Sequence, residues 1–370
     1  MYDAGWVCGA VAAAYTLIAW LAVRLRRTDA STIPVDPLPV SVLKPLCGAE
    51  PHLYECLKSF CSQDFPEFQI ICGVSNPADP AIGVVRRLQQ EFPNVEIRLS
   101  INAQQRGSNR KVSNLRNMLP LADFDHLVLA DSDILVPRDY LSKVTAPLHD
   151  QSVGVVTCTY SGKAEQGIWS SIGALFINDW FMPSARVAAL FGSRQFAFGA
   201  TIALRRDALL AIGGFAPISD QLADDYRLGE LTRARGLRTV LSECVVQTQV
   251  NEPTLARLVQ HQLRWLRTIR AVRPLGYALA FVTFGVPVTL LSYTFTTFSS
   301  ASLIMLKIAL VSRACLHLQA RSGARTPLPL VLCSDFLTFG LWCWALFAQH
   351  IHWRDTRYKI TRDGTVESVR

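Results

Sequence analysis

Charged side chains are missing from two long stretches of this 370-residue sequence, Ala4–Val23 and Pro274–Leu306. A third apolar stretch, Thr326–Trp353, is interrupted only by Asp335 and two histidines. A helix that crosses a bilayer needs ~20 apolar residues. The first two stretches therefore predict membrane-spanning helices, because core helices of soluble proteins rarely stay free of charge over such a length, and the third is compatible with one. Half of all residues are hydrophobic, which excludes an ordinary soluble enzyme.

The N-terminal apolar stretch lacks the basic residues that precede the apolar core of a cleaved signal peptide. Its positive cluster, Arg24, Arg26 and Arg27, follows the apolar run instead. By the positive-inside rule this cluster stays in the cytosol. We therefore expect residues 1–27 to be a membrane anchor, with the domain that follows facing the cytosol.

Internal repeats, low-complexity segments and cysteines at metal-ligand spacing are also absent. The ten cysteines are scattered without evident pairing, as expected for reduced and mostly buried thiols. The net charge of +8 suits a protein that lies against anionic lipid and handles a diphosphate. No motif accompanies this charge that would indicate binding to nucleic acid.

Between the apolar stretches, short apolar strands alternate with amphipathic helices. After a linker at 28–39, the expected strands are Val40–Leu46, Glu67–Ser75, Val95–Ile101, His126–Ala130, Val153–Tyr160, Thr201–Arg205 and Arg238–Val246. The helices that separate the first four are Pro51–Gln63, Ala81–Phe92 and Arg110–Leu121. This alternation predicts an α/β fold with a mostly parallel sheet flanked by helices. Ligands of such sheets bind at the carboxyl ends of the strands.

Two carboxylates follow the apolar strand His126–Ala130 directly. Asp131 and Asp133, with one small residue between them, can hold a divalent cation, Mg²⁺ or Mn²⁺, that bridges the phosphates of a nucleotide-sugar. A solvated turn has the same pattern, but the unbroken apolar strand before it favours the metal site. Asp79, just beyond the strand Glu67–Ser75, is another carboxylate expected at this edge.

Asp224 and Asp225 begin a predicted helix that ends at Gly236. Carboxylates at a helix N-terminus are favoured by the helix dipole, so capping is one interpretation. The other is a general base that accepts the proton of an attacking hydroxyl, and here Asp225 is favoured over Asp224. The Gly213-Gly214 pair is expected to bring the backbone close to the same pocket.

His261, Arg264 and Trp265 lie on a basic helix directly before the second long apolar stretch. Binding to lipid headgroups explains most arginines of this helix. Arg264 followed by Trp265 predicts more: a guanidinium that contacts a diphosphate, beside an indole that walls the acceptor.

Two further segments are candidates on weaker grounds. Lys111, at the start of a predicted helix capped by Asn109, can reach a donor phosphate. Gly167–Leu190 is rich in large apolar residues with polar ones interspersed, which fits an interfacial helix. We interpret it as one wall of an entrance for a lipid, with plain core packing as the alternative.

In combination these residues resemble the ceramide glucosyltransferase family (glycosyltransferase family 21), whose bacterial members include the hopanoid-biosynthesis-associated glycosyltransferases. The strings that match this family are Ser41–Leu46, Asp79–Ile82, Gly107–Asn114, Ala223–Tyr226 and Arg264-Trp265. The strings that look most like the hopanoid branch are Gly154–Cys158, Phe198–Arg206 and Arg264–Arg270. The resemblance covers roughly residues 1–300. It implies a GT-A fold and an inverting, metal-dependent transfer of a sugar from a UDP-sugar to a membrane lipid.

The resemblance also assigns roles to single positions. Asp79 matches the family aspartate that contacts the nucleotide, Asp131 the one at the metal and diphosphate, and Asp225 the catalytic base. Arg264 and Trp265 match the end of the family's (Q/R)xxRW motif, whose first position is His261 here, so a fixed positive charge there is not assured. Asp133 as a metal ligand rests on its chemistry more than on the family, whose eukaryotic members have a DSG-like string there. The residues and the resemblance together give catalytic Asp225, Arg264 and Trp265; donor-binding Asp79, Lys111, Asp131 and His261; and metal-binding Asp131 and Asp133.

The resemblance leaves the substrates open. The hopanoid-like strings favour UDP-N-acetylglucosamine with a polyol such as bacteriohopanetetrol, and UDP-glucose with ceramide is the alternative. An inactive membrane scaffold that binds nucleotide is an alternative of another class. The implied location is a bacterial inner membrane.

The expected organisation has five parts: an anchor at 1–27, a linker at 28–39, a cytosolic glycosyltransferase domain at 40–273, a C-terminal transmembrane region at 274–353 and a basic tail at 354–370. The number of C-terminal spans stays open. Three spans would put the tail on the side opposite the domain, and two spans with an interfacial or re-entrant piece would keep it near the site.

Overall fold

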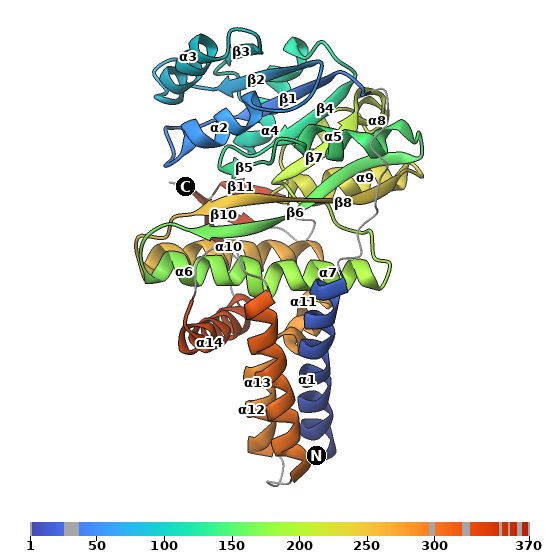
Figure 1. The fold of residues 1–370 in the computed structure, drawn as a ribbon, viewed down its shortest axis with the longest axis vertical. Helices are drawn as coiled ribbons and strands as arrows, with labels where there is room; N and C mark the ends of the chain where they lie inside the picture. Colours follow the sequence, from blue (N-terminus) through green and yellow to red (C-terminus); the bar gives the residue numbers. More distant parts are fainter. Residues whose placement is uncertain are drawn as a thin grey trace.

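The computed structural model describes residues 2–25, 37–295, 300–319 and 326–347, and the backbone of 350–353, 356–360 and 365–368. Its parts follow one another along the long axis of the molecule: a sheet with its helices, a layer of helices lying crosswise, and a helical stalk (Figure 1). Most of the expected linker at 28–39, together with Arg26 and Arg27, lies outside the described residues.

An eight-stranded sheet forms the upper layer, in the order β3-β2-β1-β4-β7-β6-β8-β5. Its strands are β1 (Val40–Pro45), β2 (Phe68–Val74), β3 (Glu96–Ile101), β4 (His126–Ala130), β5 (Ile134–Leu135), β6 (Val153–Ala164), β7 (Thr201–Arg205) and β8 (Arg238–Val250). Strands β1 to β4 pair in parallel, as do β6 and β8, whereas β7 and β5 run antiparallel to their neighbours. The seven strands expected from the sequence are confirmed, and the two-residue β5 was not predicted.

Helices cover both faces of the parallel half of the sheet because apolar residues alternate between its faces. In β1, Val42 belongs to the apolar cluster that includes α2 and α3, and the next residue, Leu43, belongs to the cluster that includes α4. The helices of this domain are α2 (Leu53–Cys61), α3 (Ala81–Glu91), α4 (Arg110–Met118), α5 (Tyr140–Thr145), α8 (Arg206–Ala211) and α9 (Asp224–Ala234).

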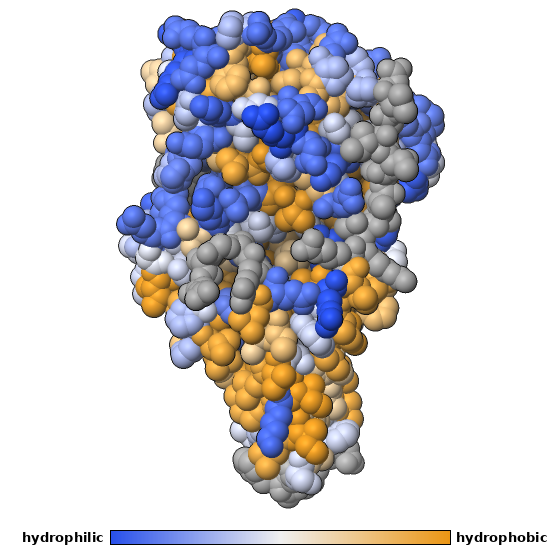
Figure 2. Space-filling view, viewed as in Figure 1, coloured by the Kyte–Doolittle hydropathy of each residue, from blue (hydrophilic) through white to orange (hydrophobic). Residues whose placement is uncertain are grey.

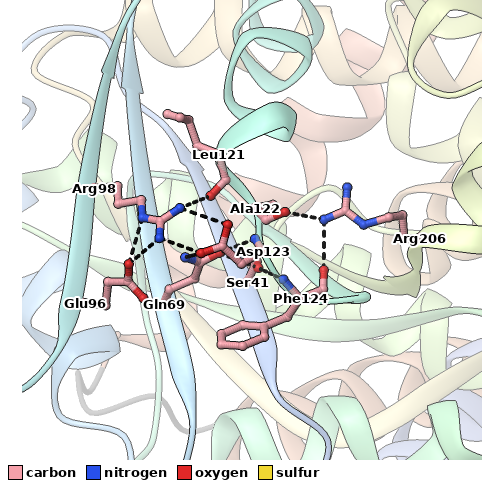
Figure 3. A network of polar contacts seen from close by, with 9 residues as sticks. All are labelled: Ser41, Gln69, Glu96, Arg98, Leu121, Ala122, Asp123, Phe124 and Arg206. Carbon is pink, nitrogen blue, oxygen red and sulfur yellow. Dashed lines mark hydrogen bonds and ion pairs between the residues drawn. The ribbon is translucent and has the colours of Figure 1, made fainter.

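Polar side chains close the edge at which the parallel strands begin (Figure 3). Ser41 on β1 donates to Gln69 on β2 at 2.8 Å, and the Arg98 guanidinium on β3 bonds Asp123 just before β4. Arg206, directly after β7, donates to the carbonyl of Phe124 at 3.0 Å. The amino ends of these strands are thereby tied together, and the candidate site lies at the opposite edge.

The crosswise layer contains α10 (Leu255–Val272) and a long helical segment from the predicted interfacial stretch. This segment is α6 (Ile168–Leu175), a π-helical turn η3 (Phe176–Phe181) and α7 (Met182–Leu190). It lies between the sheet and the stalk in Figure 1, which is where an interfacial helix belongs. The π-helical turn was not predicted. Such turns are rare in proteins, and many of those that occur lie at functional sites.

The stalk consists of α1 (Tyr2–Leu25), α12 (Gly285–Ser292) and α13 (Ser300–Gln319). Small residues let its helices approach closely; a Cβ on Gly285 would lie 1.8 Å from Thr16 Oγ1 on α1. The stalk surface is predominantly hydrophobic, in contrast to the hydrophilic upper domain (Figure 2). Within the described residues, α1, α13 and α14 (Leu328–Ala345) are long and apolar enough to cross a membrane.

Two further elements depart from simple spans. The pair α11 (Pro274–Leu279) with η5 (Ala280–Thr283) is bent by 77° from α12. Helix α14 is bonded to other helices at both ends: His317 of α13 contacts the carbonyl of Thr326 just before α14, and Tyr277 of α11 donates to the carbonyl of Trp342 near its end. Figure 1 accordingly shows α14 beside the upper end of the stalk.

The C-terminal strands β9 (His350–Trp353), β10 (Thr356–Ile360) and β11 (Val366–Ser368) form a small antiparallel sheet. A bridge between Thr365 and Gln221 joins it to the upper domain. Of the two topologies that the sequence leaves open, the structure therefore matches the one in which the tail stays on the side of the site. The side chains of most of this tail lie outside the described part of the chain.

Candidate active site

A cavity of about 1060 Å³ lies between the carboxyl edge of the sheet and the crosswise layer. It contains seven of the eight site residues expected from the sequence: Lys111, Asp131, Asp133, Asp225, His261, Arg264 and Trp265. These residues come from four separate parts of the chain: the start of α4, the end of β4, the start of α9, and α10. The carboxyl ends of the strands are the usual ligand site of such sheets.

Asp131 and Asp133 follow β4, and side chains from β1 and β8 hold them in place. The fully buried Lys44 donates to the backbone carbonyl of Asp131, and its ammonium lies 3.9 Å from the ring centre of Phe60. Thr248 on β8 donates to Asp133 at 2.9 Å. Burial and the nearby carboxylate of Asp131 raise the pKa of Asp133 to about 6. These contacts fix the turn in place, and the two neighbouring carboxylates keep an excess of negative charge there.

Lys111 is the ammonium that faces this turn. Its Nζ lies 2.6 Å from Asp131 and 3.8 Å from Asp224. Burial opposes its charge, but these two carboxylates raise its pKa overall. Asn109 caps the helix by accepting from Val112 N and reaches across to the carbonyl of Gln221, which confirms the predicted cap.

Asp225 lies at the start of α9, as predicted, and lines the cavity. Its Oδ1 accepts from the Tyr226 amide at 2.7 Å, and a Cβ on Gly199 would lie 3.1 Å from its Oδ2. Burial and the neighbouring Asp224 raise its pKa to about 6. A carboxylate with this pKa is ionised near neutral pH yet more basic than an exposed one, which suits a general base.

The predicted Gly213-Gly214 contact with the cavity is wrong. Gly213 and Gly214 have φ of 90° and 68° and form the turn after α8, where their amides bond the carbonyls of Leu210 and Leu209. Neither lines the cavity. Their positive φ explains the two glycines without a role at the site. The glycine that approaches the carboxylates is Gly199.

His261, Arg264 and Trp265 lie along α10 and face the cavity together. His261 Nδ1 lies 2.5 Å from Glu252, a buried carboxylate that also lines the cavity. Among the described residues the Arg264 guanidinium has no hydrogen bond or ion pair, and burial lowers its pKa. A half-buried guanidinium without a hydrogen bond or ion pair among the described residues, in a cavity rich in carboxylates, is placed to bind an anionic group.

An aromatic wall continues from Trp265 toward the stalk. The Trp265 ring packs edge-on against Tyr160, Phe176 and Phe181, at centroid distances of 5.9, 5.6 and 5.5 Å. Trp180 stacks on Phe176 and on Phe284, which immediately precedes α12. The cavity therefore has a charged end at the sheet and an aromatic end that adjoins the helices of the stalk.

Asp79 is the one expected site residue that does not line the cavity. Its carboxylate is buried and accepts from the amides of Ala81, at the start of α3, and of Gly48. Gly48 belongs to the loop after β1 whose residues Leu46, Cys47 and Glu50 do line the cavity. Asp79 thus holds a rim loop of the cavity, and its predicted contact with a nucleotide stays a prediction.

Comparison with known sequences decides the family. The whole chain from residue 4 to residue 366 matches the family described as "Glycosyl transferase family 21". The chain belongs to glycosyl transferase family 21. The predicted family resemblance is confirmed.

Curated relatives in several organisms are similar to this family 21 chain. Ceramide glucosyltransferase 1 of Caenorhabditis elegans is 25% identical over 245 residues, which are 65% of this chain and 52% of the relative. An N-acetylglucosaminyltransferase of Rhizobium leguminosarum bv. viciae is 23% identical over 258 residues, covering 66% of this chain and 60% of the relative. The chain spans about half the length of the first curated relatives it matches, 52% and 51%.

A solved structure shows the same fold. The mannosyltransferase PcManGT from Pyrobaculum calidifontis, determined with GDP-Man and Mn²⁺, superposes with a TM-score of 0.56 at 18% identity, over 94% of this chain and 97% of that one. The family 21 chain therefore has the predicted GT-A type α/β fold, with parallel pairing predominant in its sheet and helices at both ends that are long enough to span a membrane.

Two cavity residues, Glu50 and Glu252, and the buried Lys44 behind the turn after β4 were not singled out from the sequence of this family 21 protein. Glu50 accepts from Ser132 at 2.7 Å, Glu252 holds His261, and Lys44 supports the Asp131 carbonyl. Lys44 stands in one of the family strings, next to a proline at the end of a strand, and that position was its only signal. Glu50 has no local signal, because its partner Ser132 is 82 residues away; Glu252 lies nine residues before His261, in the loop that leads to α10.

The residues at the turn after β4 fit a divalent cation. Asp131 and Asp133 supply carboxylate oxygens, the ligands that Mg²⁺ and Mn²⁺ prefer. The described part of the chain holds no group of three or more His, Cys, Asp or Glu side chains placed to hold a metal alone. Asp131 and Asp133 would therefore bind a cation together with substrate phosphates, which is the usual mode for Mg²⁺.

Proposed function

We propose that this family 21 protein transfers a sugar from a UDP-sugar to a hydroxyl of a membrane lipid, with inversion at the anomeric carbon. The observation that supports it most is the single cavity with carboxylates at one end and an aromatic wall at the other, beside helices long enough to cross a membrane. A nucleotide diphosphate and a lipid need these two environments within reach of one another.

In the proposed reaction Asp225 accepts the proton of the lipid hydroxyl. The hydroxyl oxygen bonds the anomeric carbon while the bond from that carbon to the UDP oxygen breaks, so UDP leaves on the opposite face. Lys111 and Arg264 bind the diphosphate as it gains charge, and Trp265 walls the acceptor. A Mg²⁺ or Mn²⁺ held by Asp131 and Asp133 would neutralise charge on the diphosphate.

The remaining donor contacts are assigned more indirectly. His261, fixed by Glu252 at its Nδ1, presents its other ring nitrogen for a hydrogen bond to the donor. Asp79 supports the rim loop from Leu46 to Glu50, and a nucleotide bound against this loop would depend on it.

We propose UDP-N-acetylglucosamine as the donor and a hopanoid polyol, bacteriohopanetetrol, as the acceptor. The local strings Phe198–Arg206 and Arg264–Arg270 favour this pair. The similarity to an N-acetylglucosaminyltransferase is compatible with the donor. Ceramide with UDP-glucose is the second candidate, and the similarity to ceramide glucosyltransferases favours it.

We place the catalytic domain at 40–273, between an anchor at 1–27 and a membrane region at 274–353. We propose that the membrane is a bacterial inner membrane and that the domain faces the cytosol. Arg24, at the end of α1 next to the upper domain, supports this orientation by the positive-inside rule. The basic tail at 354–370 would then also be cytosolic.

The test is a matrix of two donors and two acceptors. The full chain in nanodiscs would receive UDP-N-acetylglucosamine or UDP-glucose with bacteriohopanetetrol or ceramide, and mass spectrometry would identify the glycolipid. UDP release that depends on the lipid, with glycosylated hopanoid as the product, is expected. Binding of UDP-sugar without any UDP release would support an inactive scaffold instead, and glucosylceramide would select the second candidate.

A further inference from the structure

Four ionisable side chains, two buried and two largely buried, lie together where the stalk meets the crosswise layer, outside the wall of the cavity described above. Arg313 donates to both oxygens of Asp335, at 2.8 Å each, and to Asp179 at 2.9 Å. His317, one turn further along α13, lies 2.8 Å from the same oxygen of Asp179. We call Asp179, Arg313, His317 and Asp335 the stalk network.

The geometry fixes the protonation of His317. Its Nδ1 faces the Asp179 carboxylate, and its Nε2 lies 3.1 Å from the carbonyl oxygen of Thr326, so both nitrogens face acceptors. A neutral imidazole has one donor only, so His317 is the imidazolium. The stalk network then holds two cations and two anions, the balance that buried charge among apolar helices requires.

Asp179 connects this network to the cavity. It belongs to the π-helical turn η3, and its side chain, 2% exposed, points away from the cavity toward α13. The next two residues, Trp180 and Phe181, line the cavity. Trp180 donates to Thr283 at 2.8 Å, and Phe181 packs against Trp265 at a centroid distance of 5.5 Å.

A small recess of about 30 Å³ shows how closely the two regions adjoin. Asp179, Arg313 and Asp335 line it, and so do Trp180, Ser184 and Thr283, which also line the main cavity. The stalk network and the aromatic wall therefore adjoin through shared residues. A shift of Asp179 would move the next two residues, Trp180 and Phe181, with it.

We propose that the stalk network positions Trp180 and Phe181 as the binding surface for the lipid acceptor, so that the helices of the stalk control acceptor binding. This inference rests on the proposed function. The four residues act as positioning residues, because they contact neither the donor end of the cavity nor Asp225. Asp179 is the link, and Arg313, His317 and Asp335 hold it from α13 and α14.

The experiment uses the full chain in nanodiscs with the donor and lipid acceptor that the wild type uses. Asp179→Asn and Asp335→Asn remove one charge each with little change of shape, and Asp335→Glu keeps the charge. Lys307→Met is the control, because Lys307 is an exposed charge on α13, the helix that carries Arg313 and His317. Initial rates give KM for the acceptor, KM for the donor and kcat separately.

The neutral variants are expected to raise KM for the acceptor about tenfold, because displaced binding groups weaken positioning far from the chemistry. KM for the donor should stay within about twofold, since Lys111, Arg264 and the β4 turn are untouched. Asp335→Glu should recover most of the loss, and Lys307→Met should match the wild type.

Each other outcome counts against the proposal. An unchanged acceptor KM in folded Asp179→Asn and Asp335→Asn, or an equal rise of both KM values, would overturn it. Failure of both neutral variants to fold, with Lys307→Met folding normally, would make the network a folding requirement and nothing more. The wild type is assayed before any variant. If it makes no glycolipid at all, the proposed function is wrong, and this result is distinct from a failure of the stalk-network proposal.

Discussion

Two clusters of charged side chains lie on either side of the aromatic wall, and they differ in balance. In the cavity, Asp131, Asp133, Asp224 and Asp225 outnumber the cations near them, Lys111, Arg264 and the buried Lys44, and the pKa of Asp133 and of Asp225 is raised to about 6. In the stalk network, an arginine and an imidazolium neutralise two carboxylates. A cluster with excess charge is ready to bind a cation or accept a proton, whereas a balanced cluster holds helices in place.

The largest effect that tests this difference is expected from Asp225→Asn. Loss of the general base should lower the transfer rate roughly 10²- to 10⁴-fold, with UDP-sugar binding nearly intact in a calorimetric titration. Because a buried carboxylate that resists ionisation destabilises the fold, the thermal unfolding temperature should stay the same or rise. A variant that keeps more than about a few per cent of transfer would contradict the assignment.

The stability readout sharpens the comparison when the same substitution is made in the stalk network. Asp179→Asn leaves Arg313 and His317 with an uncompensated charge, which costs about 3–5 kcal/mol for a buried pair. Its unfolding temperature should therefore fall well below that of Asp225→Asn. Equal unfolding temperatures would remove the distinction between the two clusters.

A smaller loss of activity, roughly hundredfold, is expected from Asp131→Asn, which removes a proposed cation ligand and a partner of Lys111. The concentration of Mg²⁺ or Mn²⁺ at half-maximal rate should rise as well, and a metal titration measures it. Asp64→Asn, an exposed aspartate elsewhere in the domain, is the control. An unaltered metal requirement in Asp131→Asn would place the cation elsewhere.

Glu252→Gln should lower transfer by about tenfold, since a hydrogen bond to a charged group is worth ~1.5–3 kcal/mol. Glu252 acts through His261, so the loss should vanish when His261→Ala is already present. A double-mutant cycle on the rates measures this coupling. Additive losses would mean that Glu252 contacts the substrate itself.

The smallest effect concerns pH. Asp225 must be ionised to accept a proton, and its pKa is raised to about 6, so the rate should fall on the acid side of that value and level off near neutrality. Asp224→Asn removes the neighbouring charge that raises this pKa, so the acid limb should move to lower pH by less than about one unit. A rate profile between about pH 5 and pH 8 measures the shift.

The sequence predicted those parts of the molecule that depend on local pattern. The strands from Val40 to Val250 show as apolar runs, and Asp131 and Asp225 stand at the end of a strand and the start of a helix, where acidic residues are conspicuous. The basic helix with Arg264 and Trp265 was also evident, because it precedes a long apolar stretch.

What the sequence did not reveal depends on partners far apart in the chain. Arg313 and Asp179 are 134 residues apart, and Ser132 and Glu50 are 82 apart, so no local pattern links them. Helix α14 has the composition of a span, and contacts at its two ends join it to α13 and to α11, of which α11 is distant from it in the sequence and precedes a bend. The π-helical turn η3 has no sequence signature at all, because it reflects the packing on its two sides.

The bridge from Thr365 to Gln221 ties the last strand of the chain to the loop that leads into α9. Gln221 accepts a hydrogen bond from the cap of the helix that bears Lys111 and precedes Asp224 by three positions. A spin label at position 365 would thus register any shift of this loop when UDP-sugar is added. A bulky reporter fused after residue 370 would therefore be expected to disturb the same loop. A reporter attached before Tyr2 would lie at the far end of the stalk, away from this loop.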